Sequence, residues 1–439
     1  MHRPISDRFA FTGLSFLILF SLITPLGAQE KEEESQALEQ AEPAPFLRVT
    51  EVKGKSISLE IASRDFVPRE GTGPTVTLMG VAHIGERSFY RLLQKELATN
   101  DLVLYESVLP PGAKGAGGES SEERIASTKA AMGFVGSLIE TYQVVQDTYP
   151  ESLATLVEFA SAEDPRLGQW LGNAMIDAWD RQLAYRFDGD RMDYTLVSLG
   201  SDGLPGGADE NGDIDLLDLD PPQPMEFGGG EDNIQAQLAS ALRLQFQLHA
   251  LNYDQPNWRC SDMAMDQVDR ALAERGVDFQ LIGGALGGTS MFARMAKVFL
   301  GLIRFADTLL DGAIADMIKV MLIEMLGNDA AMEMSLDQFG EGFSEVIVDL
   351  RNQVVIDDLK TIVEHEENLQ TIAILYGAAH MKDMAERICA QLDYEPAEDR
   401  WYQAIEVDLE KSAVNERDLR QMRMMMQQMM RMQSVKPKR

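Results

Sequence analysis

Two segments of this chain, almost three hundred residues apart, share one pattern: an apolar run, a glycine, two small residues and a histidine. The first is Val76-Thr-Leu-Met-Gly-Val-Ala-His83, and the second is Ala373-Ile-Leu-Tyr-Gly-Ala-Ala-His380. Each apolar run has the length and composition of a strand buried on both faces. Because the chain has only five histidines, finding two of them after matched strands indicates a shared structural context.

The residues around the first copy predict a strand–helix–strand unit. Strands are expected over 75–81 and 101–105, and residues 86–97 between them have the apolar periodicity of a helix. Such a unit implies parallel strands. The second copy follows a predicted helix over 345–367. We therefore expect an α/β fold whose central, mainly parallel sheet is built from the N- and C-terminal segments, with a large helical insertion between them.

We expect a single domain over 46–410, in which residues 111–335 form the mostly helical insertion. Helical pattern covers much of 122–195 and 234–274, whereas residues 198–232 form an acidic loop. This loop has seven carboxylates between Asp202 and Asp220 and no Lys or Arg among them. Its alternating acidic residues resemble a calcium loop, but Ile214 stands where such a loop needs glycine. A solvated acidic loop is the favoured alternative.

The two ends of the chain have their own compositions. Arg3 and Arg8 precede an apolar run over 9–26, which is typical of a signal peptide over 1–28, either cleaved or retained as an anchor. Residues 29–45 resemble a disordered linker, and residues 411–439 form a basic, Met-rich tail. These features predict an exported protein, periplasmic or secreted, or anchored by its uncleaved N-terminal segment.

The net charge of −32 argues against nucleic-acid partners and against binding to anionic lipid. We expect no membrane contact beyond the N-terminal segment. Cys260 and Cys389 are the only cysteines, and sequence leaves open whether they form a disulfide or two separate thiols.

Three chemically active side chains follow predicted strands. His83 and His380 end the two matched segments, and Glu106 follows the strand over 101–105. In an open parallel sheet, ligands bind at the carboxyl ends of the strands. Two imidazoles and one carboxylate suit a divalent metal ion such as zinc, manganese or cobalt. The sequence therefore predicts His83, His380 and Glu106 as metal ligands.

These motifs resemble the TraB/GumN/TIKI family, which is related to the erythromycin-esterase/ChaN-like group. The resemblance rests on Gly80-Val-Ala-His83, on Glu106, on Gly377-Ala-Ala-His380 and on Arg351 in Leu-Arg-Asn-Gln. The segment over 253–262 resembles a further motif of that family. The resemblance implies an exported metal-dependent hydrolase, and a metalloprotease if it follows the TIKI branch, with a peptide or a small molecule as substrate.

Two catalytic roles follow from this interpretation. Glu106 is expected to bind the metal or to activate its water, and Arg351 to stabilise negative charge that develops in the reaction. Arg351 has the alternative of a structural ion pair with a neighbouring carboxylate: Asp349, Asp357 or Glu345.

Two other functions remain open. One is a metal-free hydrolase in which a histidine and Glu106 act as an acid/base pair. The other is a protein that binds a metal or another ligand without turnover.

Overall fold

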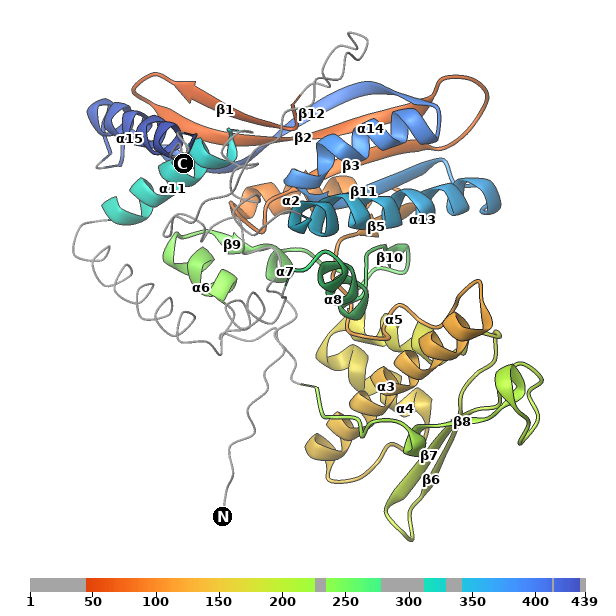
Figure 1. Ribbon diagram of the computed structural model, residues 1–439. Helices are drawn as coiled ribbons and strands as arrows, with labels where there is room; N and C mark the ends of the chain where they lie inside the picture. Colours follow the sequence, from red (N-terminus) through yellow and green to blue (C-terminus); the bar gives the residue numbers. More distant parts are fainter. Residues whose placement is uncertain (1–44, 226–233, 278–311, 329–341, 413, 435–439) are drawn as a thin grey trace, which may run out of the picture. The chain divides into compact units, whose positions relative to one another are not determined.

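The computed structural model describes residues 45–225, 234–277, 312–328, 342–412 and 414–434. They belong to two compact units. The insertion unit comprises Ser107–Gly230 and Met263–Ala271, and the sheet unit comprises the other described residues (Figure 1). The predicted signal peptide and nearly all of the predicted linker lie outside the described residues. Among those that are described, no helix has the length and apolar character needed to cross a membrane.

The sheet unit is built on a seven-stranded sheet. Its strand order is β1 (Leu47–Val52), β2 (Ser56–Pro68), β3 (Thr75–Val81), β11 (Thr371–Gly377), β5 (Leu102–Tyr105) and β10 (Trp258–Cys260), and β12 (Tyr394–Asp408) also pairs with β2. The four strands from β3 to β10 are parallel, whereas β1, β2 and β12 pair in antiparallel fashion. The predicted α/β fold, with a central sheet made by both chain ends, is confirmed.

Strand β11 lies in the middle of this sheet. It pairs with β3 on one side and with β5 on the other, and its register places Tyr376 opposite Gly80. Its residues alternate between the two faces, with Ala373 and Leu375 in one apolar cluster and Ile374 in the other. The two copies of the repeated sequence are therefore neighbours in the sheet.

Helices cover both faces of the sheet. On one face, α2 (Arg87–Leu97) buries Phe89, Tyr90, Leu93 and Leu97. On the other, α13 (Arg351–His365) and α14 (Met381–Gln391) lie along the sheet (Figure 1). Both helices contribute to the second apolar cluster. A π-helical turn, η4 (Glu345–Leu350), leads into α13, and the short turn η5 (Ala378–His380) leads into α14.

The described part of the basic tail packs against the sheet unit. Helix α15 (Glu416–Ser434) buries Leu419 in the same cluster as α11 (Ala313–Leu326). Arg423 of α15 forms ion pairs with Glu324 and Glu51. Charge attraction and apolar burial both hold this helix to the acidic body.

The described residues of the insertion unit include three helices before a small antiparallel sheet. The helices are α3 (Ser121–Gln146), α4 (Leu153–Glu163) and α5 (Pro165–Ala174). The strands β6 (Ala184–Asp188), β7 (Asp193–Ser198) and β8 (Ile214–Asp215) follow, with the turns η2 (Asp209–Asn211) and η3 (Leu216–Asp218) around β8, and α8 (Met265–Glu274) begins in this unit. Helix α3 begins with a capping box, in which Ser120 and Glu123 each accept the other's backbone N–H.

Two helical predictions are wrong in part. Residues 184–198 form a hairpin, because Gly189 lies in a turn between two segments with alternating aromatic and β-branched residues. Within 234–274, α6 (Ile234–Ala241) and α7 (Gln247–Ala250) are separated by β9 (Gln245–Phe246), which pairs with β4 (Ile84–Gly85). Residues 277–282, whose apolar sequence predicts a strand, lie outside the described residues except for Val277. No disulfide joins Cys260 to Cys389.

Leu375→Ala tests the central role of β11. Leu375 is fully buried, so we expect the substitution to lower the free energy of unfolding by about 2–5 kcal/mol through lost burial and a residual cavity. Urea titration followed by hydrogen exchange of sheet peptides measures the change. Leu92→Ala, at a side chain that is 47% exposed, is the control, and an equal effect in both variants would contradict the assignment of β11 to the core.

Candidate functional site at the carboxyl edge of the sheet

The parallel strands bring the predicted site residues to one edge of the sheet. His83 follows β3, Glu106 follows β5, and His380 lies in η5 immediately after β11. A Cβ atom placed on Gly377 would lie 3.2 Å from Oε2 of Glu106, 3.5 Å from Cδ2 of His380 and 3.8 Å from Nε2 of His83. The predicted convergence of two imidazoles and a carboxylate is therefore present around Gly377.

The glycines of the repeated sequence have direct packing roles. A Cβ on Gly80 would lie 2.8 Å from Cγ2 of Ile61, closer than real Cβ atoms approach. At Gly377, the backbone N–H donates to Oε2 of Glu106 at 2.7 Å, and the absence of a side chain leaves room for that carboxylate. Strand packing and carboxylate binding thus account for both glycines.

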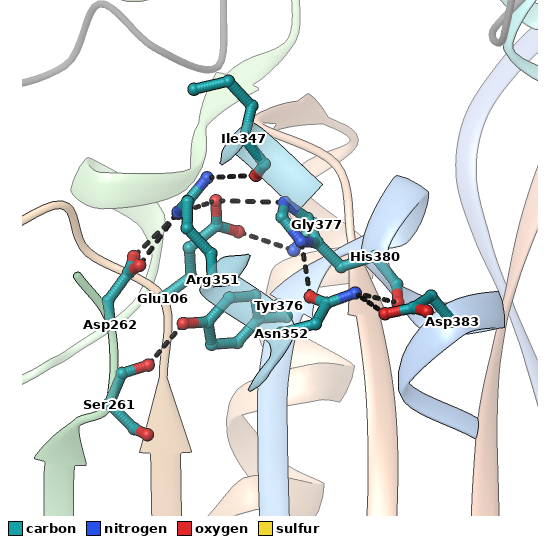
Figure 2. A network of polar contacts seen from close by, with 10 residues as sticks. All are labelled: Glu106, Ser261, Asp262, Ile347, Arg351, Asn352, Tyr376, Gly377, His380 and Asp383. Atoms are coloured by element: carbon teal, nitrogen blue, oxygen red, sulfur yellow. Dashed lines mark hydrogen bonds and ion pairs between the residues drawn. The ribbon is translucent and has the colours of Figure 1, made fainter. Parts of the chain in front are cut away.

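A buried arginine organises the centre of the site (Figure 2). Arg351 is the first residue of α13, and its side chain is 3% exposed. Its Nη2 donates to Oε1 of Glu106 at 2.8 Å and to Oδ2 of Asp262 at 2.7 Å, and its Nε donates to Oδ1 of Asp262 at 2.8 Å. Nη1 donates to the carbonyl of Ile347 in the π-helical turn. The guanidinium is thus held between two carboxylates.

Asp262 was absent from the predicted site. Its side chain is fully buried, and it follows β10 much as Glu106 follows β5. The sequence signal for Asp262 is a carboxylate soon after a strand. That signal is not recognisable, because β10 is too short to be predicted from periodicity. The ion-pair partners that the sequence offered for Arg351, which were Asp349, Asp357 and Glu345, are wrong. The observed partners are Asp262 and Glu106.

A second missed residue, Asn352, orients His380. Its Nδ2 donates to Oδ2 of Asp383 at 2.8 Å, so its Oδ1 faces Nδ1 of His380 at 2.7 Å. Because an amide oxygen only accepts, Nδ1 carries the proton in this network. The Nε2 lone pair then faces Oε1 of Glu106 across 3.8 Å (Figure 2).

Burial and neighbouring charges keep the two histidines neutral and Glu106 ionised. Burial, reinforced by Arg351 and His83, lowers the pKa of His380 to about 4, although Glu106 opposes the shift. Burial likewise lowers the pKa of His83. Burial alone would raise the pKa of Glu106, but Arg351 and the Gly377 N–H outweigh it and hold that pKa far below its usual range. At neutral pH the site has two neutral imidazoles beside an ionised carboxylate.

This arrangement is rich in hydrogen-bond acceptors. Glu106 and Asp262 are paired with a single arginine, so one negative charge in this group is not balanced by it. Within the ranges that the structure describes, no group of three or more His, Cys, Asp or Glu side chains is placed to hold a metal ion.

Comparison with known proteins points to the other unit. Residues 117–216 match the family model described as type II secretion system (T2SS), protein G. Over 87 residues, the chain is 31% identical to the type II secretion system core protein G of Xanthomonas campestris pv. campestris. The aligned region covers 20% of this chain and 61% of that protein. No solved structure matches the chain significantly. The residues matched by the family model lie within the insertion unit.

These matches correct the functional prediction. Membership of the TraB/GumN/TIKI family is wrong, because the matching family is a secretion-system protein. The same matches contradict the predicted metal-dependent hydrolase and its peptide or small-molecule partner. They also contradict the two alternatives, a metal-free hydrolase and a protein that binds a ligand without turnover. The physical reason is that the two Gly-x-x-His segments are short, and that packing accounts for their glycines. A match to a secretion-system protein does support the prediction of an exported protein.

The low pKa of His380 predicts a specific pH dependence of stability. The unfolded chain binds a proton near pH 6.5 and the folded chain only near pH 4, so protons favour unfolding between these values. The contribution of His380 to the free energy of unfolding is fully present above pH 6.5. This contribution falls by roughly 3 kcal/mol as the pH drops to 4. Urea titrations across this range should show a shallower pH dependence in His380→Gln.

His365→Gln, at an exposed histidine on α13, is the matched control. A pH dependence that is equally steep in wild type and His380→Gln would show that His380 titrates normally. Ring NMR signals of His380 report the same protonation directly.

Proposed function

We propose that this chain is a component of a type II secretion system and that the insertion unit makes its contacts with other components. The single observation that carries the proposal is the protein G match over residues 117–216. The chain spans about three fifths of the length of the matched relative. For this reason, we infer the partners of the chain from the surface of the insertion unit in addition to the family match.

The insertion unit has a core of its own. Helices α3, α4 and α5 bury apolar residues that include Leu138, Leu156 and Leu171. Asp177, after α5, accepts hydrogen bonds from the backbone of Trp179 and Arg181 and from Oγ of Ser198. These contacts join the last helix to β7. A unit stabilised from within is suited to present a docking surface.

The surface of this unit combines exposed apolar side chains with acidic ones. Val144 and Val145, near the end of α3, are 65% and 55% exposed. Leu204 and Leu217 lie among the seven carboxylates of residues 202–220 and are 64% and 73% exposed. Within the described residues, no ion pair joins any of these seven carboxylates to a cation. Exposed apolar groups in such a setting are typical of protein interaction sites.

The charge of this surface defines the partner. A protein with a basic rim around an apolar patch would complement the acidic loop and cover Leu204 and Leu217. The binding is expected to weaken with salt, because most of these carboxylates are solvent-exposed. We propose a secretion-system component with such a face, met on the periplasmic side, with the apolar N-terminal run retained as an anchor.

We make a separate proposal for the residues at the carboxyl edge of the sheet. We propose Glu106 and Arg351 as functional groups there, together with His83 and His380. A divalent ion such as zinc, manganese or cobalt remains a prediction. Glu106 is already engaged by Arg351 and Gly377, so an ion would have to displace one of these contacts.

Metal analysis of the purified chain tests that prediction. If His83 and His380 are ligands, His83→Ala and His380→Ala should lose the divalent ion that copurifies with the wild type, whereas His365→Ala should retain it. Equal metal content in all four proteins would exclude both histidines as ligands.

Leu217→Glu tests the proposed docking surface. We expect at least a tenfold loss of binding to purified protein G of Xanthomonas campestris, because an exposed apolar contact becomes a charge in an acidic setting. Val52→Glu, at a residue of the sheet unit that is 50% exposed, should bind as the wild type does. Absence of wild-type binding, or an equal loss in both variants, would contradict the proposal.

A further inference from the structure

Three tyrosine rings of the insertion unit form one group, the tyrosine cluster. Tyr149 lies in the connection between α3 and α4, Tyr185 in β6 and Tyr194 in β7. The ring centroids of Tyr149 and Tyr194 are 4.8 Å apart, and those of Tyr185 and Tyr194 are 6.0 Å apart. These are the separations of aromatic rings in contact, so three segments of the unit meet at Tyr194.

Backbone pairing and a hydrogen bond hold the tyrosine cluster in place. The register of β6 with β7 places Phe187 opposite Tyr194. Tyr185, two residues before Phe187, therefore shares a face of the hairpin with Tyr194. The hydroxyl of Tyr185 donates to the carbonyl of Pro150 at 2.6 Å, which ties β6 to the residue next to Tyr149.

A carboxylate lies against the centre of the cluster. The hydroxyl of Tyr194 donates to Oε1 of Glu140 in α3 at 2.9 Å. Burial, together with the charges of Glu140 and Asp193, raises the pKa of Tyr149. Burial and Glu140 likewise raise the pKa of Tyr194. The rings therefore lie in a negative electrostatic environment.

Within the part of the chain that the structure describes, no ion pair joins either of these carboxylates to a cation. The two arginines of the hairpin are placed elsewhere. Arg186 lies on the opposite face from Tyr185, because neighbouring residues in a strand alternate between faces. Arg191 pairs with Asp188 at 3.7 Å. The negative charge beside the tyrosine cluster can therefore be matched by a cation from a partner.

The cluster lies at the surface of the unit. Its three rings are half-buried, and Asp193 is exposed. Val144 is one helical turn after Glu140 on the same face of α3, and it is 65% exposed. Aromatic faces, a carboxylate and an apolar rim together suit a side chain that has an apolar stem and a positively charged end.

We propose that the tyrosine cluster, together with Glu140, binds an arginine side chain of a secretion-system partner. The guanidinium stacks on the tyrosine rings, whose faces attract cations. Its planar fork donates to Glu140, because a carboxylate that accepts from Tyr194 keeps further lone pairs. The methylene stem packs toward Val144. This inference rests on the proposed docking function of the insertion unit, and it names the side chain that docks.

Titration of the full chain with a short peptide tests the site directly. The probe is acetyl-Gly-Arg-Gly-amide, and its control is the same peptide with citrulline, which has the shape of arginine but no charge. We expect the arginine peptide to shift the NMR signals of the three rings and to bind at least about tenfold more tightly than the citrulline peptide. Absence of ring shifts, or equal binding of the two peptides, would overturn the proposal.

Glu140→Gln and Tyr149→Leu test the two kinds of group in the site. The first removes the charge but keeps an acceptor for Tyr194, and the second removes a ring but keeps apolar bulk. Each should weaken binding of the arginine peptide at least about fivefold. Glu158→Gln, at an exposed carboxylate of α4, is the matched control and should bind as the wild type does. An equal loss in all three variants would reduce the binding to general attraction by an acidic chain and exclude the site.

These outcomes are separate from those of the docking test. Leu217→Glu reports on binding of protein G, whereas the arginine peptide reports on the tyrosine cluster alone. Binding of protein G without binding of the arginine peptide would keep the docking function and reject the arginine site. Peptide binding without binding of protein G would support the site and contradict the docking function. Ring shifts with phosphatidylcholine vesicles, and none with the arginine peptide, would assign the cluster to a lipid headgroup and overturn the proposal.

Discussion

The parallel pairing of β11 between β3 and β5 is the constraint on which the sheet unit depends. It joins strands from the two ends of the chain, and it requires the carboxyl ends of all three strands to lie at one edge. His83, Glu106 and His380 meet there because each follows one of these strands. The helix that begins at this edge, α13, supplies Arg351 and Asn352. A chemically active cluster is thus a consequence of topology.

The strands and their terminal residues were predictable because the signals are local. Apolar runs, the intervening helix and the parallel rule place His83, Glu106 and His380 without further information. Asp262 and Asn352 were not predictable in this way. Asp262 matters only because the three-residue strand β10 joins the edge of β5, and Asn352 only because α13 faces η5. Their roles depend on pairings across the chain, which leave no periodic pattern.

The insertion unit shows the opposite difficulty. Its hairpin over 184–198 lies largely in the segment 122–195 whose pattern predicts helix, because the three helices that precede the hairpin dominate that pattern. The family match lies over 117–216, in residues with no catalytic side-chain pattern. For a unit whose proposed role is docking, surface composition is the relevant signal, and motif searches for catalytic groups do not detect it.

Burial, with a contribution from Arg351, lowers the pKa of His83 and of His380 although carboxylates lie nearby. A carboxylate near an imidazole normally favours the charged ring, yet burial and the guanidinium prevail at His380. The arginine pairs with Glu106 on one side and with Asp262 on the other, so neither carboxylate depends on a histidine for its partner. The histidine instead uses Nδ1 for Asn352 and presents a lone pair toward Glu106. The same residue therefore binds both carboxylates and contributes to the low pKa of His380.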